Sequence, residues 1–254
     1  MATDPSLEAL TLALADNAVR VVDLTQPLSE STPVLQLPPP FANAPGLSRE
    51  DISRYDERGP AWAWSTLTVG EHVGTHFDAP VHWITGRDGE DVASVAPAKL
   101  VAPCAVIDKS AEAAADPNYL VTLDDIHAWE REHGPLPPGG WMLLRTGWDA
   151  RAHDQEAFLN DAQTPGPDVD AARWLAEVSP IVGVGVETVG TDAGAAHSFE
   201  PPFPVHHFML GAGKYGLTQL ANLAELPPTG AIIVVAPLKL VDGTGSPSRV
   251  FALL

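Results

Sequence analysis

Three histidines and one aspartate lie within eleven residues of this chain: His72, His76, Asp78 and His82. Imidazole nitrogen and carboxylate oxygen are the ligands that Zn²⁺, Mn²⁺ and Fe²⁺ prefer in such combinations. His76 and Asp78 are two positions apart, so both side chains leave the same face of an extended segment. Gly74 lets the backbone fold back, which brings His72 towards the same ion. Three ligands from one loop would leave coordination positions open, as in catalytic metal sites.

This pattern predicts a hydrolase. A divalent ion lowers the pKa of bound water far enough for the water to attack an amide carbonyl near neutral pH. His82, with an ordinary imidazole pKa near about 6.5, is suited to accept the proton and return it to the leaving nitrogen. His76 and Asp78 with a distant histidine would also fit the facial triad of a non-haem iron oxygenase. That alternative leaves His72 and His82 without a role.

The segment before the cluster predicts a strand. Residues 62–70 alternate with period two, placing Trp62 and Trp64 on one side. The cluster itself contains Pro80 and glycine, which argue against a regular helix and for a loop or bent strand end. We expect Trp62 and Trp64 either to form an aromatic wall that binds a flat substrate or to pack as ordinary core residues of the strand.

The rest of the chain alternates between predicted strands and helices. Further strands are expected at 20–28, 100–108, 140–148, 181–190, 230–241 and 248–254, with helices at 122–134 and 168–180. Thr122 and Asp125 have the spacing of a helix-capping pair, Asp168 opens the later helix, and Ser6 is expected to cap an N-terminal amphipathic helix. The alternation predicts one α/β domain over residues 1–254, with sheets covered on both faces. Residues 37–60 show few periodic signals and are expected to form a lid or to reach a neighbouring subunit.

Composition excludes several classes of function. The chain has 33 acidic against 14 basic residues and a formal net charge of −19, which argues against nucleic acid and anionic membranes as partners. No apolar run approaches the roughly 18 residues of a membrane-spanning helix. The single cysteine, Cys104, lies in an apolar run and is expected to be a small buried hydrophobe. The N-terminal residues lack the basic region of a signal peptide, so a cytoplasmic location is expected.

The eleven-residue stretch also carries a family resemblance. His72-Val-Gly-Thr-His76-Phe-Asp78-Ala-Pro-Val-His82 matches every fixed position of the motif His-x-Gly-Thr-His-x-Asp-x-Pro-x-His. It resembles the metal-dependent cyclase family, which includes bacterial kynurenine formamidases and isatin hydrolases. The segments "VVDLTQPLSESTPV" and "APLKLVDGTGSPSRVFAL" are also similar to that family. The resemblance implies mixed β-sheets in a barrel-like core with flanking helices, a homodimer or higher homo-oligomer, metal binding by His72, His76 and Asp78, and acid–base catalysis by His82.

The resemblance extends to a second pair of residues. Kynurenine formamidases with two zinc ions have a downstream histidine and a glutamate twelve residues later, where this chain has His207 and Gln219. A neutral amide is a poorer ligand for a second cation than a carboxylate, so we expect one metal per chain. We expect Gln219 to bind the metal and His207 the substrate, with His206 as the competing choice for the histidine.

The family resemblance finally implies a reaction. Isatin hydrolases are similar to this chain in having one manganese site with a glutamine at this position. The expected cofactor is therefore one divalent ion per chain, Mn²⁺ first and Zn²⁺ second. The expected activity is opening of the cyclic amide of a small aromatic substrate, isatin to isatinate. Kynurenine formamidase activity, or another amide or lactone hydrolysis, is the alternative.

Overall fold

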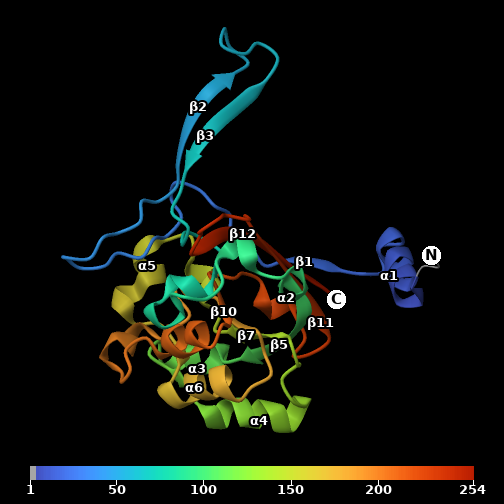
Figure 1. Cartoon of the computed structure of the whole chain (residues 1–254), viewed down its shortest axis with the longest axis vertical. Helices are drawn as coiled ribbons and strands as arrows, with labels where there is room; N and C mark the ends of the chain where they lie inside the picture. The colour runs from blue at the N-terminus through green and yellow to red at the C-terminus, as the bar shows by residue number, and fades with distance from the viewer. Residues whose placement is uncertain (1–3) are drawn as a thin grey trace.

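A ring of strands forms the centre of the computed structural model, which describes residues 4–254 (Figure 1). In pairing order the ring consists of β12 (Gly245–Leu253), β11 (Ala231–Pro237), β5 (Val101–Asp108), β7 (Trp141–Arg145), β9 (Gly183–Val186), β10 (Tyr215–Thr218) and β4 (His76–Asp78). Strand β4 pairs with both β10 and β12, which closes the ring, and β1 (Val21–Asp23) pairs with β12 outside it. The pairs β5–β7, β7–β9 and β9–β10 are parallel and the others are antiparallel. The predicted α/β domain with a barrel-like core of mixed strands is confirmed.

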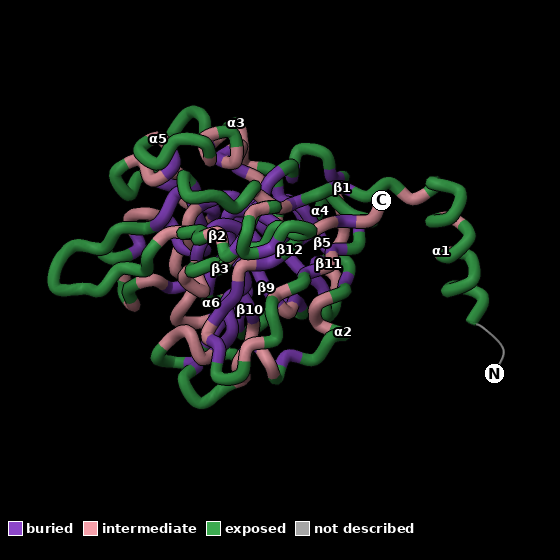
Figure 2. The backbone as a smooth tube through the Cα atoms, turned by 90° about the horizontal axis from the view of Figure 1, so that it is seen from above, coloured by how far each residue is buried: buried purple, intermediate pink, exposed green. Residues whose placement is uncertain are grey.

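Both faces of the sheet are buried along β7, β9, β10 and β4, whereas β11 and β12 alternate between buried and more exposed residues. On β5 and β7, Val106 and Leu143 belong to one apolar core, together with residues of the other ring strands. Ile107 and Leu144, the next residue on each strand, belong to a second core formed with the flanking helices. Figure 2 shows this buried backbone in purple at the centre of the molecule. Coverage of the sheet on both faces is therefore confirmed for the parallel strands β7, β9 and β10 and not for β11 and β12. Every strand predicted from the sequence is present with shorter or shifted bounds.

The helices predicted at 122–134 and 168–180 begin where their capping residues predict. Residues 4–254 contain six α-helices. They are α1 (Pro5–Ala15), α2 (Pro97–Leu100), α3 (Ser110–Ala115), α4 (Leu123–His133), α5 (Gln155–Leu159) and α6 (Val169–Glu177). Thr122 and Asp125 form a reciprocal capping box on α4, and Asp168 caps α6. Asp4 caps α1 in place of Ser6, whose backbone N–H donates to Asp4 Oδ1 at 2.9 Å, because proline at the first helical position moves the start of the helix forward. None of the helices within residues 4–254 has the length and apolar character needed to cross a membrane.

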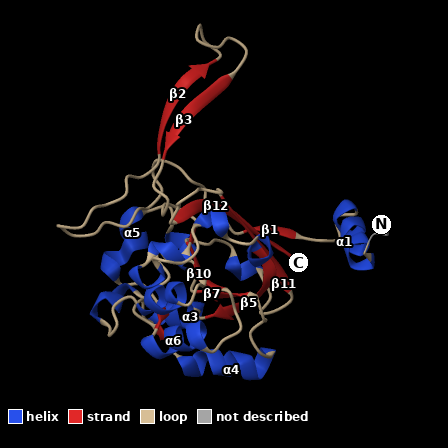
Figure 3. Ribbon diagram, in the orientation of Figure 1, coloured by secondary structure: helices blue, strands red, loops and turns tan. Residues whose placement is uncertain are grey.

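Two segments stand away from the ring. Strands β2 (Ser48–Arg54) and β3 (Ala63–Thr68) form an antiparallel hairpin that projects from the body, and α1 lies on another side with no buried residue (Figures 1 and 3). Strand β3 confirms the strand predicted at 62–70, whereas β2 lies within the segment 37–60 and was not predicted. Its sequence, SREDISR, is too polar for an alternating pattern because nearly all of it is exposed to solvent.

Candidate functional site

Strand β4 sets the position of two residues of the cluster. Phe77 is completely buried in the interior of the ring, with its ring centroid 5.2 Å from that of Tyr215. Because neighbouring residues of a strand point to opposite faces, His76 and Asp78 share the other face, with His76 Nε2 3.4 Å from Asp78 Oδ1. Gly74 has a φ of +67°, so the backbone before the strand turns as the sequence predicted.

His72 and His82 lie against the same carboxylate. His72 Nδ1 is 2.8 Å from Asp78 Oδ1, and the rings of His72 and His82 are stacked with centroids 3.8 Å apart. His72, Asp78 and His82 each offer a ligand atom within 4.8 Å of the others, which makes them a candidate metal site. His76 lies at the edge of this group, with its ring 5.2 Å from that of His72. The structure thus brings together all four residues that the sequence singled out.

The donor atoms at this cluster fit a cation. His76 Nδ1 donates to the carbonyl of Gly74 at 2.7 Å, which leaves Nε2 as an acceptor beside Asp78, with the Thr218 hydroxyl 3.1 Å away. Gln219 directly follows Thr218, the strand partner of His76. It is 1 % exposed, and its Oε1 has no hydrogen-bond partner among the described residues. A buried carbonyl oxygen without a donor is costly unless a ligand satisfies it. This oxygen and the nitrogens beside Asp78 are donors of the kind that a divalent cation takes.

Charges and burial shift three pKa values here. Burial opposes ionisation of Asp78, but the charge of His76 and the hydrogen bond from His72 hold the pKa of Asp78 well below its usual range. Burial lowers the pKa of His82 to about 3, against the attraction of Asp78, so His82 is neutral at pH 7 and its pKa lies well below the ordinary imidazole value that the sequence suggested. Burial would also lower the pKa of His206, but the hydrogen bond and charge of Asp192 raise it overall.

The structure places His206, rather than the expected His207, beside the cluster. The His206 ring lies 5.6 Å from that of His82, and Asp192 Oδ2 accepts a hydrogen bond from its Nδ1 at 2.5 Å. His207 contributes its backbone carbonyl to Thr85 and turns its ring towards Phe208. Both histidines belong to a π-helical turn, His206–Leu210, in which consecutive side chains point in different directions. Spacing to Gln219 cannot reveal which of the two faces the site.

The aromatic residues beside the cluster also differ from those expected. Trp62 and Trp64 lie on the projecting hairpin and are 52 % and 56 % exposed, so they do not form a wall of this chain's own cluster. Trp83 lies there instead, with its ring 4.8 Å from that of His206 and 5.6 Å from that of Phe203. Trp83 directly follows the last histidine of the motif, which is a signal that the sequence offered.

The structure also contains a buried carboxyl group that was not predicted, Glu187. It follows β9 and is 1 % exposed. Its Oε2 accepts hydrogen bonds from Thr146 N at 2.7 Å, Thr146 Oγ1 at 3.1 Å and Trp148 N at 3.1 Å. Burial, with the charge of Asp149, raises the pKa of Glu187 to about 7 despite these donors. The next residue, Thr188, accepts a hydrogen bond from the backbone of Gln219 at 2.9 Å.

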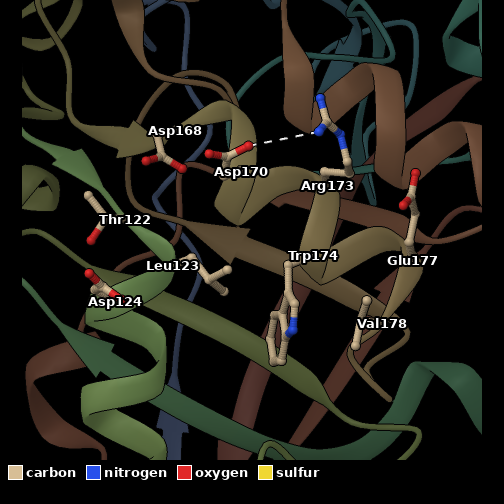
Figure 4. Close-up of a pocket in the computed structure, with 9 residues that line it drawn as sticks. All are labelled: Thr122, Leu123, Asp124, Asp168, Asp170, Arg173, Trp174, Glu177 and Val178. Atoms are coloured by element: carbon tan, nitrogen blue, oxygen red, sulfur yellow. Dashed lines mark ion pairs between the residues drawn. The ribbon is translucent and has the colours of Figure 1, made fainter.

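A hollow on the outer surface lies apart from these residues. Figure 4 shows it at the start of α4 and along α6, lined by Thr122, Leu123, Asp124, Asp168, Asp170, Arg173, Trp174, Glu177 and Val178. Asp168 is engaged as a helix cap, and Asp170 lies 3.9 Å from Arg173. None of the residues of the His/Asp cluster lines this hollow. The candidate site is therefore the cluster of His72, His76, Asp78 and His82, and this hollow is not part of it.

The fold agrees with comparisons to known proteins. Residues 22–193 match the Cyclase family model, described as "Putative cyclase", and the chain belongs to this family. An isatin hydrolase of Roseibium aggregatum is 49 % identical over 100 % of this chain and 99 % of its own length. A crystal structure of an isatin hydrolase bound to the product analogue thioisatinate superposes with a TM-score of 0.96 at 48 % identity, covering 100 % of this chain and 99 % of that one. A kynurenine formamidase of Salinibacter ruber is 29 % identical over 72 % of this chain and 76 % of its length.

Proposed function

We propose that this protein is a metal-dependent hydrolase that opens the cyclic amide of isatin to give isatinate. The full-length similarity to an isatin hydrolase supports this substrate, and the similarity to a kynurenine formamidase is both weaker and shorter. The observation that carries the proposal is the position of His82. Its neutral ring is stacked on His72 beside Asp78, and within residues 4–254 no hydrogen bond occupies its nitrogens.

The proposed metal ligands are His72, His76, Asp78 and Gln219, with one ion per chain. The convergence of the first three and the unpartnered Gln219 Oε1 support this assignment. We propose Mn²⁺ ahead of Zn²⁺, because a site with an amide oxygen and a carboxylate suits a harder cation. When bound, such an ion would polarise the amide carbonyl and activate water.

The residues of the chain would divide the remaining work. Water adds to the amide carbon, the bond from this carbon to the ring nitrogen breaks, and the nitrogen receives a proton. His82 would accept the proton of the attacking water and deliver it to the leaving nitrogen. His206, held through Nδ1 by Asp192, would take the substrate-binding role first expected of His207 by donating from its other nitrogen to a substrate oxygen. Trp83 offers an aromatic face for the flat ring.

Metal content and turnover of two variants test this assignment. We expect about one metal per chain in the wild-type protein. Asp78→Ala should lose both metal and isatin turnover, whereas His82→Ala should keep the metal and lose turnover by about 10²- to 10⁴-fold. A nitrogen of His82 lies within 4.8 Å of an Asp78 oxygen, close enough for both to bind one ion. If His82→Ala loses the metal, His82 is a metal ligand and its role as the acid–base residue is refuted.

The substrate is tested separately with N-formylkynurenine. Isatin and N-formylkynurenine would be supplied to the same preparation loaded with Mn²⁺ or with Zn²⁺. Faster isatin opening supports the proposal. Two zinc ions per chain with formamide cleavage would contradict both the substrate and the single-metal assignment of Gln219.

We further propose a homodimer in which Trp62 and Trp64 bind substrate in the partner's site. A two-stranded hairpin is marginally stable alone, and this one exposes Trp62, Trp64 and Leu67, the last at 60 %. A second copy of the chain would cover this surface. The expected aromatic wall would then come from across the interface and not from the same chain.

Mixing two inactive variants tests the shared site. His82→Ala lacks the acid–base residue but keeps the hairpin, whereas a Trp62→Ala/Trp64→Ala variant lacks only the hairpin aromatics. If the hairpin serves the partner, a mixed dimer has one intact site and mixing restores activity. Light scattering should give the mass of two chains for each variant. Dimers that stay inactive after subunit exchange, or a monomeric wild-type protein, would refute the arrangement.

A further inference from the structure

The outer nitrogen of His72 is part of a hydrogen-bonded chain that reaches the last strand of the ring. His72 Nε2 lies 2.9 Å from Thr244 Oγ1, and Thr244 Oγ1 lies 2.5 Å from Glu71 Oε2. The backbone N–H of Thr244 donates to the same Glu71 oxygen at 3.1 Å. Thr244 therefore touches His72 on the side away from Asp78.

Glu71, at the end of this chain of hydrogen bonds, fixes which atom donates in each bond. Glu71 Oε2 already accepts from the backbone N–H of Thr244, and the Thr244 hydroxyl donates its single proton to the same oxygen. The hydroxyl oxygen is then an acceptor for His72, and Nε2 must carry the proton. This leaves the lone pair of His72 Nδ1 pointing at Asp78 Oδ1, 2.8 Å away. Two lone pairs so close together require a cation between them. In the metal-free protein a proton on Nδ1, donated to Asp78, takes its place.

The backbone of the same segment is fitted to the imidazole ring. Gly245 lies opposite Asp78 in the pairing of β12 with β4, and the Thr244 carbonyl accepts from Ala79 N at 2.9 Å. A Cβ atom at Gly245 would lie 2.4 Å from His72 Cε1 and 2.9 Å from Nδ1. Only glycine leaves room for the ring at this place.

We propose that Thr244 and Glu71 are positioning residues that fix His72 as its Nε2–H tautomer, with Nδ1 directed at the cation. This inference rests on the proposed metal role of His72. Partners of this kind typically change metal affinity about 10- to 100-fold when removed. Neither residue touches the substrate in this account, and both act through His72.

Three variants separate this role from a general structural one. Thr244→Val keeps the shape of the side chain but removes the acceptor, and Thr244→Ser restores the hydroxyl. Glu71→Ala frees the Thr244 proton, which can then be donated to His72 Nε2. Thr11→Val removes a comparable threonine hydrogen bond, to Leu7 on α1, and serves as the matched control.

The first readout is the tautomer of His72 in the metal-free protein, from the ¹⁵N shifts of its ring nitrogens. We expect a proton on Nε2 in the wild type, Thr244→Ser and Thr11→Val, and loss of that proton, with only Nδ1–H left, in Glu71→Ala. The second readout is the dissociation constant for Mn²⁺ and Zn²⁺ against a chelator. We expect it to rise about 10- to 100-fold in Thr244→Val and Glu71→Ala and to recover in Thr244→Ser.

An unchanged tautomer in Glu71→Ala, or equal metal affinity in Thr244→Val and wild type, would overturn the inference. If Thr244→Val does not fold, Glu71→Ala and Thr244→Ser still decide it. Neither measurement uses isatin. A protein that binds metal as expected but does not open isatin would therefore refute the proposed substrate and leave the positioning role standing.

Discussion

Glu187 offers a test of the structure that does not depend on the proposed activity. Glu187 directly follows β9, and its buried carboxyl group accepts three hydrogen bonds from Thr146 and Trp148. Burial and the charge of Asp149 nevertheless raise its pKa from 4.5 to about 7. The folded protein therefore binds this proton more tightly than the unfolded chain does. The contribution to stability is fully present below the unfolded pKa of 4.5 and is lost as the pH rises through about 7.

The size of the effect follows from these two pKa values. Because Glu187 has a pKa of about 7 in the folded protein and 4.5 in the unfolded chain, its proton stabilises the fold less as the pH rises. The free energy of unfolding should fall by about 2 kcal/mol between pH 5.5 and pH 8. Glu187→Gln keeps an oxygen that accepts from the same donors and removes the charge. The free energy of unfolding of the variant should therefore fall by about 2 kcal/mol less than that of the wild type over this pH range.

Urea unfolding at several pH values, followed by tryptophan fluorescence, measures this difference. Glu132→Gln, at a side chain that is 77 % exposed, is the matched control and should follow the wild type. If the curves of wild type and Glu187→Gln run parallel from pH 5.5 to pH 8, Glu187 does not titrate in this range. The reasoning from burial would then be wrong.

Two further predictions concern a helix cap and the downstream histidines. Thr122→Ala removes the hydroxyl half of the α4 capping box and should lower the free energy of unfolding by about 1 kcal/mol, with Thr122→Ser as the control in the same urea assay. An unchanged midpoint would mean that the cap does not contribute. His206→Ala should reduce isatin turnover by about 100-fold or more, whereas His207→Ala should leave turnover nearly unchanged. A large loss of turnover in His207→Ala and little change in His206→Ala would show that His207, the residue chosen from its spacing to Gln219, serves the site.

Local patterns allowed much of the fold to be predicted. The capping box at Thr122 and the cap at Asp168 depend on contacts within three residues, so their chemistry is legible in the sequence. The same holds for His76 and Asp78, because alternation on a strand places residues two apart on one face. Strand β2 escaped prediction because its exposed faces impose no apolar pattern.

The sequence by itself determined the cluster of His72, His76, Asp78 and His82, whose members lie within eleven residues. Only the tertiary structure decided what surrounds it. Trp62 and Trp64 are carried away on a hairpin, and His206 faces the cluster where His207 does not. Thr244 meets Glu71 across 173 positions because β12 closes the ring against β4. Ring closure and the direction of a helical turn are set by packing between distant segments, which no local pattern contains.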